Sequence, residues 1–173
     1  MGGDHGPRVT VSALLESLSH HSNVNALLFG DRDELATQLK NCIDSAVLSR
    51  IEVRHSDCSV CDTDKPSAVI RNKRDSSMGL ALQALANNEA DAFVSAGNTG
   101  AIMALGLYYV KSLPGISRPA ICTAIPTSTG RSYVLDLGAN LDCSAQQLYQ
   151  FALLGSMMAA ELDGIDSPVV RLL

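Results

Sequence analysis

The sequence predicts an α/β domain, and two observations support this prediction. The spacing of apolar residues changes repeatedly along the chain between the period of an amphipathic helix and the short continuous runs of buried strands. Glycine-rich loops also follow apolar runs, as they do where parallel strands lead into helices. This alternation is typical of an α/β domain built on a parallel sheet.

The first part of the chain shows this alternation clearly. Apolar spacing over residues 11–18 predicts a helix soon after Pro7, which is tolerated in a first helical turn. The run at 24–29 predicts a short strand, and the spacing from 35 to 39 predicts a second amphipathic helix. Ile51 and Val53 suggest another brief strand. The polar segment that follows, 56–66, is predicted to be a loop.

The middle of the chain repeats the pattern around one glycine-rich loop. Residues 76–87 predict a helix, with serine oxygens available to the free N–H groups of its first turn. Residues 92–94 are predicted to form a buried strand that leads into SAGNTGA at 95–101. The helical spacing of 102–109 then predicts that this loop opens a further helix.

The last third of the chain predicts two strands and a long helix. Apolar runs at 120–125 and 133–137 flank a turn at 128–130, so they are expected to form neighbouring strands. Residues 145–162 predict a largely buried helix. Residues 169–173 are expected to begin another strand.

The composition indicates a soluble globular domain. Of 173 residues, 46% are hydrophobic, which is enough to bury a core, and 18% are charged. The net charge of -5 argues against nonspecific attraction to nucleic acid or to an anionic bilayer. No apolar stretch has the length of a membrane-spanning helix, and the N-terminus lacks the pattern of a signal peptide. We therefore expect a cytoplasmic protein that binds no nucleic acid.

The five cysteines are expected to be reduced, because their number is odd and a core-rich chain does not need disulfides. Cys58 and Cys61 form one CxxC, which is half of a zinc or redox motif, but no second ligand pair follows. Cys122 is expected to be a core residue. Cys143 lies next to LDLGANLD, yet no nearby histidine would activate it, so we interpret it as a packing residue. The sequence predicts no metal and no cofactor.

Three glycine-rich loops are the strongest functional signal: MGGDHGP at 1–7, SAGNTGA at 95–101 and LDLGANLD at 135–142. Each is expected to open a helix, where unpaired N–H groups and the helix dipole favour an anion and glycine permits close approach. For any single loop, an ordinary strand-to-helix turn is an equally good explanation. The catalytic candidates are Asn98, Thr99, Asp136 and Asn140. The phosphate-binding candidates within the loops are Asp4, Gly6, Gly97, Gly100 and Gly138.

A short basic stretch precedes the helix predicted at 76–87 in this otherwise acidic chain. Arg71 and Arg74 offer planar donors that match phosphate oxygens, and Ser76 and Ser77 could extend the same cradle. These four residues are further phosphate- or substrate-binding candidates. A solvated helix terminus is the simpler explanation of the charges alone.

The positions of the loops suggest an incomplete domain. MGGDHGP stands at residue 1 without the strand that normally feeds such a loop, and the last predicted strand has no loop after it. We therefore expect residues 1–173 to be a single incomplete α/β domain that lacks its first strand.

The ordered motifs resemble the bacterial PlsX family of acyl-acyl-carrier-protein:phosphate acyltransferases, and the resemblance covers almost the whole chain. Besides MGGDHGP, the matching features are Arg71 and Arg74 before SSM at 76–78, SAGNTGA, GISRPA at 115–120, LDLGANLD and FALLGS at 151–156. Because these motifs occur in order, the resemblance is very specific.

The resemblance implies a fold and a set of partners. It implies a three-layer α/β/α sandwich with a mostly parallel sheet, related to phosphotransacetylase and isocitrate-dehydrogenase-like folds, of which this chain is the truncated N-terminal half. It also implies a homodimer that uses acyl-acyl-carrier-protein and inorganic phosphate. Peripheral contact with the inner face of the cell membrane would come through the missing C-terminal half.

The resemblance further implies transfer of a long-chain fatty acyl group to phosphate, giving acyl-phosphate for phospholipid synthesis, with the fragment alone expected to be inactive. Loop amides with Asn98, Thr99 and Asn140 would hold phosphate and the oxyanion, without a covalent acyl-enzyme. Arg71 and Arg74 would guide phosphate or the carrier protein, while Asp4 and Asp136 would orient loop amides. The alternatives are a phosphotransacetylase-like enzyme that uses acyl-coenzyme A and a noncatalytic module that binds the carrier protein.

Overall fold

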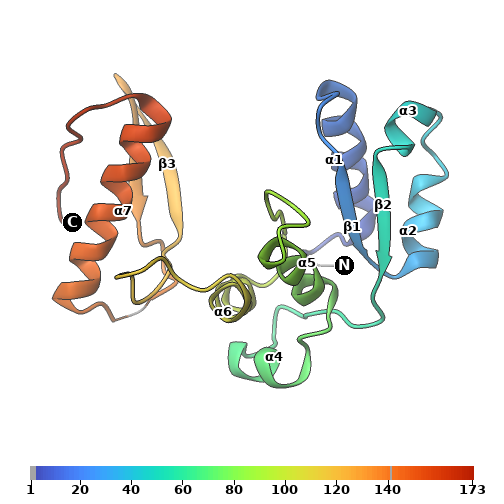
Figure 1. Cartoon of the computed structure of the whole chain (residues 1–173), viewed down its shortest axis with the longest axis horizontal. Helices are drawn as coiled ribbons and strands as arrows, with labels where there is room; N and C mark the ends of the chain where they lie inside the picture. Colours follow the sequence, from blue (N-terminus) through green and yellow to red (C-terminus); the bar gives the residue numbers. More distant parts are fainter. Residues whose placement is uncertain (1–2, 141) are drawn as a thin grey trace. The chain divides into compact units, whose positions relative to one another are not determined.

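The computed structural model describes residues 3–140 and 142–173. The chain forms two compact units, Met1–Lys111 and Ser112–Leu173, each with its own internal contacts (Figure 1). Both units combine helices with a pair of strands, so the chain is α/β, as the sequence predicts.

The first unit contains eight helices and strands among its described residues. They are α1 (Pro7–His20), β1 (Ala26–Gly30), α2 (Arg32–Leu39), α3 (Ser45–Leu48), β2 (Ile51–His55), α4 (Pro66–Asn72), α5 (Ser77–Ala86) and α6 (Thr99–Tyr109). β1 and β2 pair in parallel, with Ala26 opposite Ile51 and Gly30 opposite His55. The strands predicted at 24–29 and around 51–53 and the helices at α1, α2, α5 and α6 are confirmed.

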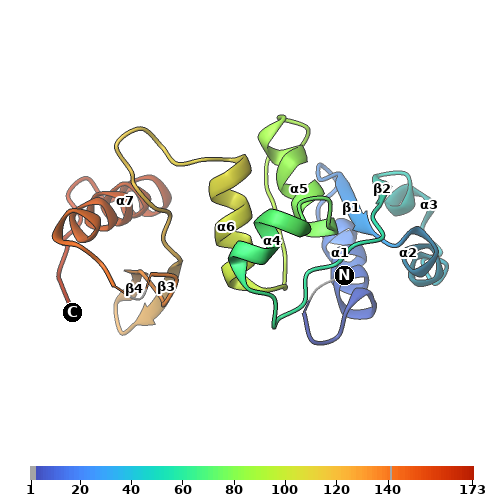
Figure 2. The same cartoon turned by 90° about the horizontal axis from the view of Figure 1, so that it is seen from below.

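The loop predicted at 56–66 is confirmed up to residue 65, and helix α4, which the sequence did not predict, follows it. Pro66 instead starts the helix, where its fixed φ suits the first turn and its missing N–H costs nothing. The helix packs against α6, and α5 packs against α6 as well (Figure 2). Their shared core consists of Val60, Val69, Met78, Leu82, Ala101 and Leu105.

The predicted buried strand at 92–94 is wrong. These residues form no strand in the described structure, and Val94 is 94% exposed. A short apolar run becomes a strand only where a neighbouring strand supplies its hydrogen bonds, and among the described residues of this unit β1 and β2 pair only with each other. The segment therefore reaches SAGNTGA without regular secondary structure.

The second unit is a hairpin followed by a long helix. β3 (Cys122–Thr127) and β4 (Gly130–Leu135) pair antiparallel, with Cys122 opposite Leu135. Helix α7 (Ala145–Asp163) begins with a capping box, in which Ser144 and Gln147 each bond to the other's backbone. The neighbouring strands and the helix are confirmed, whereas no strand forms at 169–173 in the described structure.

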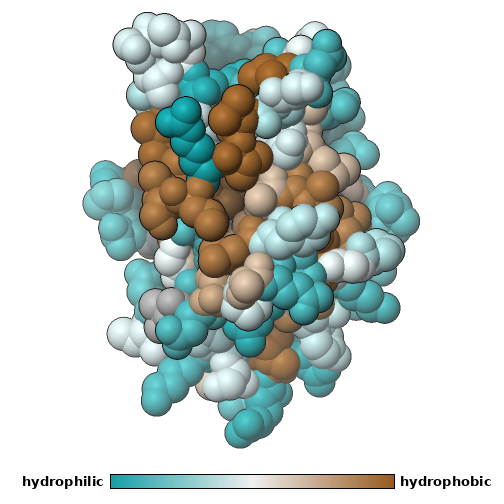
Figure 3. All heavy atoms as spheres, turned by 90° about the vertical axis from the view of Figure 1, so that its left-hand side faces the viewer, coloured by the Kyte–Doolittle hydropathy of each residue, from teal (hydrophilic) through white to brown (hydrophobic). Residues whose placement is uncertain are grey.

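Burial along α7 also differs from the prediction of a largely buried helix. Gln150, Phe151 and Ala159 are buried, but Tyr149 is 69% exposed and Met157 is 58% exposed. Figure 3, which faces the second unit, shows apolar side chains gathered at its surface. No helix in residues 3–140 and 142–173 is long and apolar enough to span a membrane.

Two glycines provide a test of how tightly α5 is packed. A Cβ atom at Gly79 would lie 2.0 Å from the carbonyl oxygen of Arg74, whereas one at Gly106 in α6 would meet nothing within 4 Å. We expect Gly79→Ala to lower the free energy of unfolding by about 3 kcal/mol, because the backbone has to move. Gly106→Ala should instead raise it by up to about 1 kcal/mol. Urea denaturation of both variants measures this, and equal effects would contradict the packing described.

Candidate functional site

The first two glycine-rich loops lie against each other. Gly3 has a φ of +76°, and a Cβ atom there would lie 3.0 Å from the carbonyl oxygen of Ala96 in SAGNTGA. Gly6 caps the start of α1 with a φ of +57° and accepts hydrogen bonds from Val9 and Thr10. The loop that carries Asp4 and Gly6 is therefore a neighbour of SAGNTGA, although the two are about ninety residues apart.

Asn98 ties SAGNTGA to the segment at 61–64. Its Oδ1 accepts a hydrogen bond from the N–H of Ala101 at 3.0 Å, which caps α6. Its Nδ2 lies within 3.0–3.1 Å of the carbonyl oxygens of Cys61, Asp62 and Asp64. The side chain of this catalytic candidate is thus engaged with backbone, which gives Asn98 a positioning role in this structure.

The N-terminus of α6 has the features expected of an anion site. Thr99 is the first residue of the helix and is exposed. Gly100 packs closely against Pro66 of α4, because a Cβ atom added at Gly100 would lie 3.0 Å from the Pro66 Cγ. The Gly97 N–H donates to the Ser95 hydroxyl at 3.1 Å. In the described part of the chain, no hydrogen bond is made by the N–H groups of Thr99 and Gly100, so both remain available to a ligand.

The predicted basic stretch is divided between paired and unpaired cations. Lys73 lies 2.6 Å from the Asp64 carboxylate, and this hydrogen bond holds the pKa of Asp64 below its usual value and raises the pKa of Lys73. Arg74 donates to the Tyr108 hydroxyl at 2.5 Å and lies over the same ring. Arg71 is exposed and forms no hydrogen bond or ion pair within residues 3–140 and 142–173. Of the two arginines, Arg71 is the freer to meet an anion.

Ser76 and Ser77 lie inside the first unit. Ser76 is 0% exposed, and its hydroxyl accepts a hydrogen bond from the Gly79 N–H at 3.2 Å, which confirms the predicted cap of the helix. Ser77 is 4% exposed, and its N–H donates to the carbonyl of Cys58 at 3.0 Å. Contact between these hydroxyls and a surface-bound phosphate would require this turn to open.

Asp136 organises the third glycine-rich loop, in the second unit. Its carboxylate accepts hydrogen bonds from the N–H of Ile121 at 2.9 Å, the N–H of Asn140 at 2.6 Å and the Asn140 Nδ2 at 2.8 Å. The N–H of Ala139 lies at 3.4 Å. Burial raises the pKa of Asp136, but these hydrogen bonds lower it by more, so the net pKa is below the usual value. These hydrogen bonds agree with the orienting role expected of this carboxylate, which stays a prediction.

Asn140 and Gly138 complete this loop. The Asn140 Nδ2 also donates to the carbonyl of Pro119 at 3.1 Å, so its side chain joins LDLGANLD to the preceding GISRPA segment. Gly138 has a φ of +82°, which few other residues adopt. Next to these residues is an open hollow lined by Arg118, Ala139, Asn140, Asp142 and Gln147. We did not single out Arg118 from the sequence, although it lies within a motif that carries the family resemblance.

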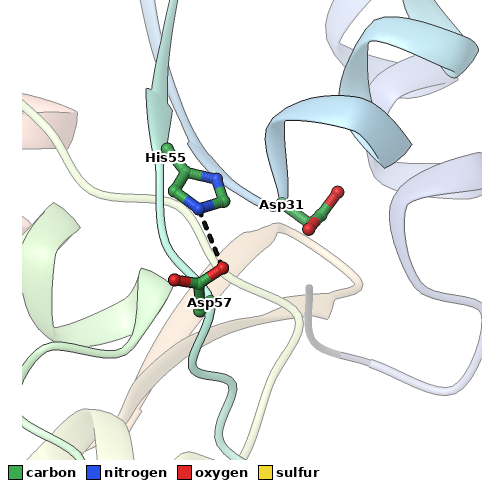
Figure 4. A group of neighbouring side chains, drawn as sticks. All are labelled: Asp31, His55 and Asp57. Atoms are coloured by element: carbon green, nitrogen blue, oxygen red, sulfur yellow. Dashed lines mark hydrogen bonds and ion pairs between the residues drawn. The ribbon is translucent and has the colours of Figure 1, made fainter.

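A separate group of titratable side chains lies where β1 and β2 end and consists of Asp31, His55 and Asp57 (Figure 4). The His55 Nδ1 accepts a hydrogen bond from the Arg32 N–H at 3.2 Å, and its Nε2 lies 2.8 Å from Asp57. Asp31 caps α2 through the Glu34 N–H. Because both ring nitrogens of His55 are engaged, this geometry fits a structural hydrogen-bond chain better than a metal site.

The cysteine positions agree with structural rather than chemical roles. Between Cys58 and Cys61, Val60 is buried in the core of the first unit. Burial raises the pKa of the Cys58 and Cys122 thiols, which makes both less reactive. The Cys143 thiol lies 3.9 Å from the carbonyl of Asn140, within the loop that it was predicted to pack against.

Comparison of the sequence with known proteins identifies the family of this chain. A family model described as "Fatty acid synthesis protein" matches residues 1–173. A phosphate acyltransferase from Nitrosococcus oceani is 49% identical over 173 residues, which cover all of this chain and 51% of that protein. A phosphate acyltransferase from Methylococcus capsulatus is 46% identical over the same length and coverage. One from Vibrio campbellii is 47% identical over 162 residues, or 93% of this chain and 47% of that protein.

The chain belongs to the fatty acid synthesis protein family. It spans about half the length of these relatives. The resemblance noted from the motifs is thereby confirmed. The match to the family model includes all three glycine-rich loops.

The contacts of Asn98 predict that it stabilises this family member through two separable interactions. We expect Asn98→Ala to lower the free energy of unfolding by about 2 kcal/mol, because the helix cap and the carbonyl contacts are both lost. Asn98→Asp retains the cap but places a carboxylate against three carbonyl oxygens, so it should also destabilise. The control is Asn72→Ala, at an exposed helix end. Urea denaturation reports all three, and an unchanged Asn98→Asp protein would show that the carbonyl contacts do not matter.

The lowered pKa of Asp136 predicts a dependence of stability on pH. A depressed folded-state pKa means that ionised Asp136 contributes stability above its unfolded pKa of about 3.9, and that this contribution is lost as pH falls through the folded value. Asp136→Asn should cost about 1–3 kcal/mol at pH 7. As the pH falls from about 5 through the unfolded pKa and then through the lower folded pKa of Asp136, the Asp136→Asn protein should lose less further stability than the wild type.

The measurement is the unfolding free energy of both proteins across this pH range. Asp166→Asn is the control, because Asp166 is exposed and forms no hydrogen bond in the described part of the chain. Parallel pH profiles for the wild type and Asp136→Asn would contradict the role assigned to the Asp136 hydrogen bonds.

Proposed function

We propose that the full-length protein transfers a long-chain fatty acyl group from acyl-acyl-carrier-protein to inorganic phosphate, giving acyl-phosphate for phospholipid synthesis. The observation that carries the proposal is similarity along the whole chain to proteins named phosphate acyltransferase. The ordered glycine-rich loops supply the anion-binding groups that such a reaction needs.

The reaction is one of positioning and charge stabilisation. A phosphate oxygen attacks the thioester carbonyl carbon, the carbon–sulfur bond breaks, and the carrier thiol leaves with a proton. The N–H groups of Thr99 and Gly100 at the start of α6, which make no hydrogen bond in the described part of the chain, suit an oxyanion or a phosphate oxygen. Asn98 keeps this helix start in place, and Asp136 does the same for the loop that carries Asn140. Neither role requires a covalent acyl-enzyme.

Two surface features support the proposed substrates. Arg71 is exposed and without a partner in the described part of the chain, so it can attract phosphate or an acidic carrier protein. Asp4 and Gly6 lie in the loop next to SAGNTGA, where they would line the same site. Gly97, Gly138, Ser76 and Ser77 would act by shaping the loops, since the N–H groups of Gly97, Ser76 and Ser77 donate within the protein.

We extend the proposal to the architecture of the full-length protein. The two units described above would join the second half of the protein in one three-layer α/β/α domain related to phosphotransacetylase and isocitrate-dehydrogenase-like folds. The protein would act as a homodimer in the cytoplasm, and its second half would touch the inner face of the membrane. The similarity over half the length of the relatives supports this proposal.

The test is an acyl-transfer assay on the full-length protein. With long-chain acyl-acyl-carrier-protein and inorganic phosphate, we expect phosphate-dependent release of free carrier protein together with acyl-phosphate. Short-chain acyl-coenzyme A should not replace the donor. Activity only with acyl-coenzyme A would indicate a phosphotransacetylase-like enzyme instead, and binding of the carrier protein without turnover would indicate a noncatalytic module.

Variants in the same assay test the site. Asn98→Ala and Asn140→Ala should each lower kcat by about 10²-fold, the typical effect of removing or misplacing an oxyanion donor. Asn72→Ala, at an exposed helix end, should leave kcat unchanged. Full activity in both site variants would overturn the proposed site while leaving the reaction itself established.

A further inference from the structure

Gln150 is a buried polar side chain that binds a single loop. It lies on α7 and is 5% exposed. Its Oε1 accepts hydrogen bonds from the Ser117 N–H at 3.0 Å and the Ser117 hydroxyl at 2.7 Å, and its Nε2 donates to the carbonyl of Gly115 at 2.7 Å. A buried amide with all these bonds strongly fixes the backbone that it contacts.

The same loop is also held just after residue 118. The Pro119 carbonyl accepts a hydrogen bond from the Asn140 Nδ2 at 3.1 Å, and the Ile121 N–H donates to Asp136 at 2.9 Å. Proline at 119 also restricts the backbone of the residue before it to extended conformations. The main chain is therefore fixed on both sides of Arg118, from α7 on one side and from LDLGANLD on the other.

Arg118 itself is exposed and carries an unused charge. It makes no hydrogen bond or ion pair within residues 3–140 and 142–173, whereas Arg131 in the same unit is paired with Asp163. Arg118 lines the hollow with Ala139, Asn140, Asp142 and Gln147. Since Asp142 repels an anion, a ligand would lie toward Arg118 and away from Asp142. A free guanidinium on a fixed loop is preorganised to bind a phosphate group.

We infer that Arg118 binds the inorganic phosphate substrate, and that buried Gln150 is the positioning residue that holds Arg118 in place. This inference rests on the proposed function for the identity of the ligand. The assignment adds a cationic phosphate ligand beside the third loop, whose own charged side chains are the carboxylates Asp136 and Asp142.

The kinetic test uses the full-length protein with phosphate varied at fixed acyl-acyl-carrier-protein, and then the reverse. Arg118→Gln should raise the KM for phosphate by at least about tenfold and leave the KM for the carrier substrate and kcat within about threefold, as expected for lost ground-state binding. Arg118→Lys should have a smaller effect, because lysine keeps the charge but not the planar fork. Arg171→Gln, which removes another exposed arginine of the second unit, is the control.

Gln150 is tested with two variants. Gln150→Leu removes all three hydrogen bonds, while Gln150→Glu retains an acceptor for Ser117 and loses the donor to Gly115. Both should raise the KM for phosphate by about three- to tenfold with kcat within about threefold, and Gln150→Glu, which keeps part of the contact, should have the smaller effect. A purely structural role would lower the amount of active protein, hence apparent kcat, without changing KM.

Direct binding separates this inference from the proposed function. Equilibrium dialysis with radiolabelled inorganic phosphate needs no turnover, and Arg118→Gln should weaken binding by at least about tenfold. Unchanged phosphate binding and an unchanged phosphate KM would overturn the inference even if the enzyme transfers acyl groups. A rise in the KM for the carrier substrate alone would also overturn it. If acyl transfer is absent, the proposed function fails while dialysis still decides whether Arg118 binds phosphate.

Discussion

The side chain of Asn98 satisfies backbone groups of two segments at once, and the candidate site of the first unit depends on it. Its oxygen caps α6, while its nitrogen reaches the carbonyl groups of 61–64. A glycine-rich loop has few side chains with which to fix itself, so a neighbouring element must hold it. Because the Asn98 side chain forms both sets of hydrogen bonds, it fixes the start of α6, with its free N–H groups, against the segment at 61–64.

In the second unit, a charged side chain fixes a glycine-rich loop in the same way. Asp136 gathers the N–H groups of Ile121, Ala139 and Asn140, so a single carboxylate fixes the turn of LDLGANLD and its connection to β3. A carboxylate that accepts several N–H groups stays ionised, which agrees with its lowered pKa. Asp136 is therefore better understood as the group that shapes the site than as one that reacts.

The sequence predicted much of this fold because periodicity reports which face of an element is buried. The helices at α1 and α5 and the strands β1 and β2 were predicted from apolar spacing, whereas the parallel pairing of the two strands is seen only in the structure. The strand predicted at 92–94 failed because an apolar run says nothing of whether a partner strand is present. The burial of α7 was overestimated for a similar reason, since apolar residues such as Tyr149 lie on more than one side of that helix.

The candidate site was predictable as a set of loops but not as a set of contacts. Asp4 and Asp136 could be expected to orient loop amides, because two carboxylates without a bridging cation are weak evidence for a metal site. That Asn98 would be engaged by three carbonyl groups depends on the path of residues 61–64, which local sequence does not encode. The role of Gln150 was hidden for the same reason, because a glutamine within a helix pattern gives no sign of the loop that it contacts.

Charge pairing divides the basic side chains of this acidic chain into two groups. Lys73, Arg54 and Arg131 are each paired with carboxylates, so their charges are largely cancelled locally. In the described part of the chain, Arg71 and Arg118 are exposed arginines without such partners. A chain with a net charge of -5 gains little from long-range attraction of an anion, so any anion that it binds has to be held by local cations and oriented N–H groups.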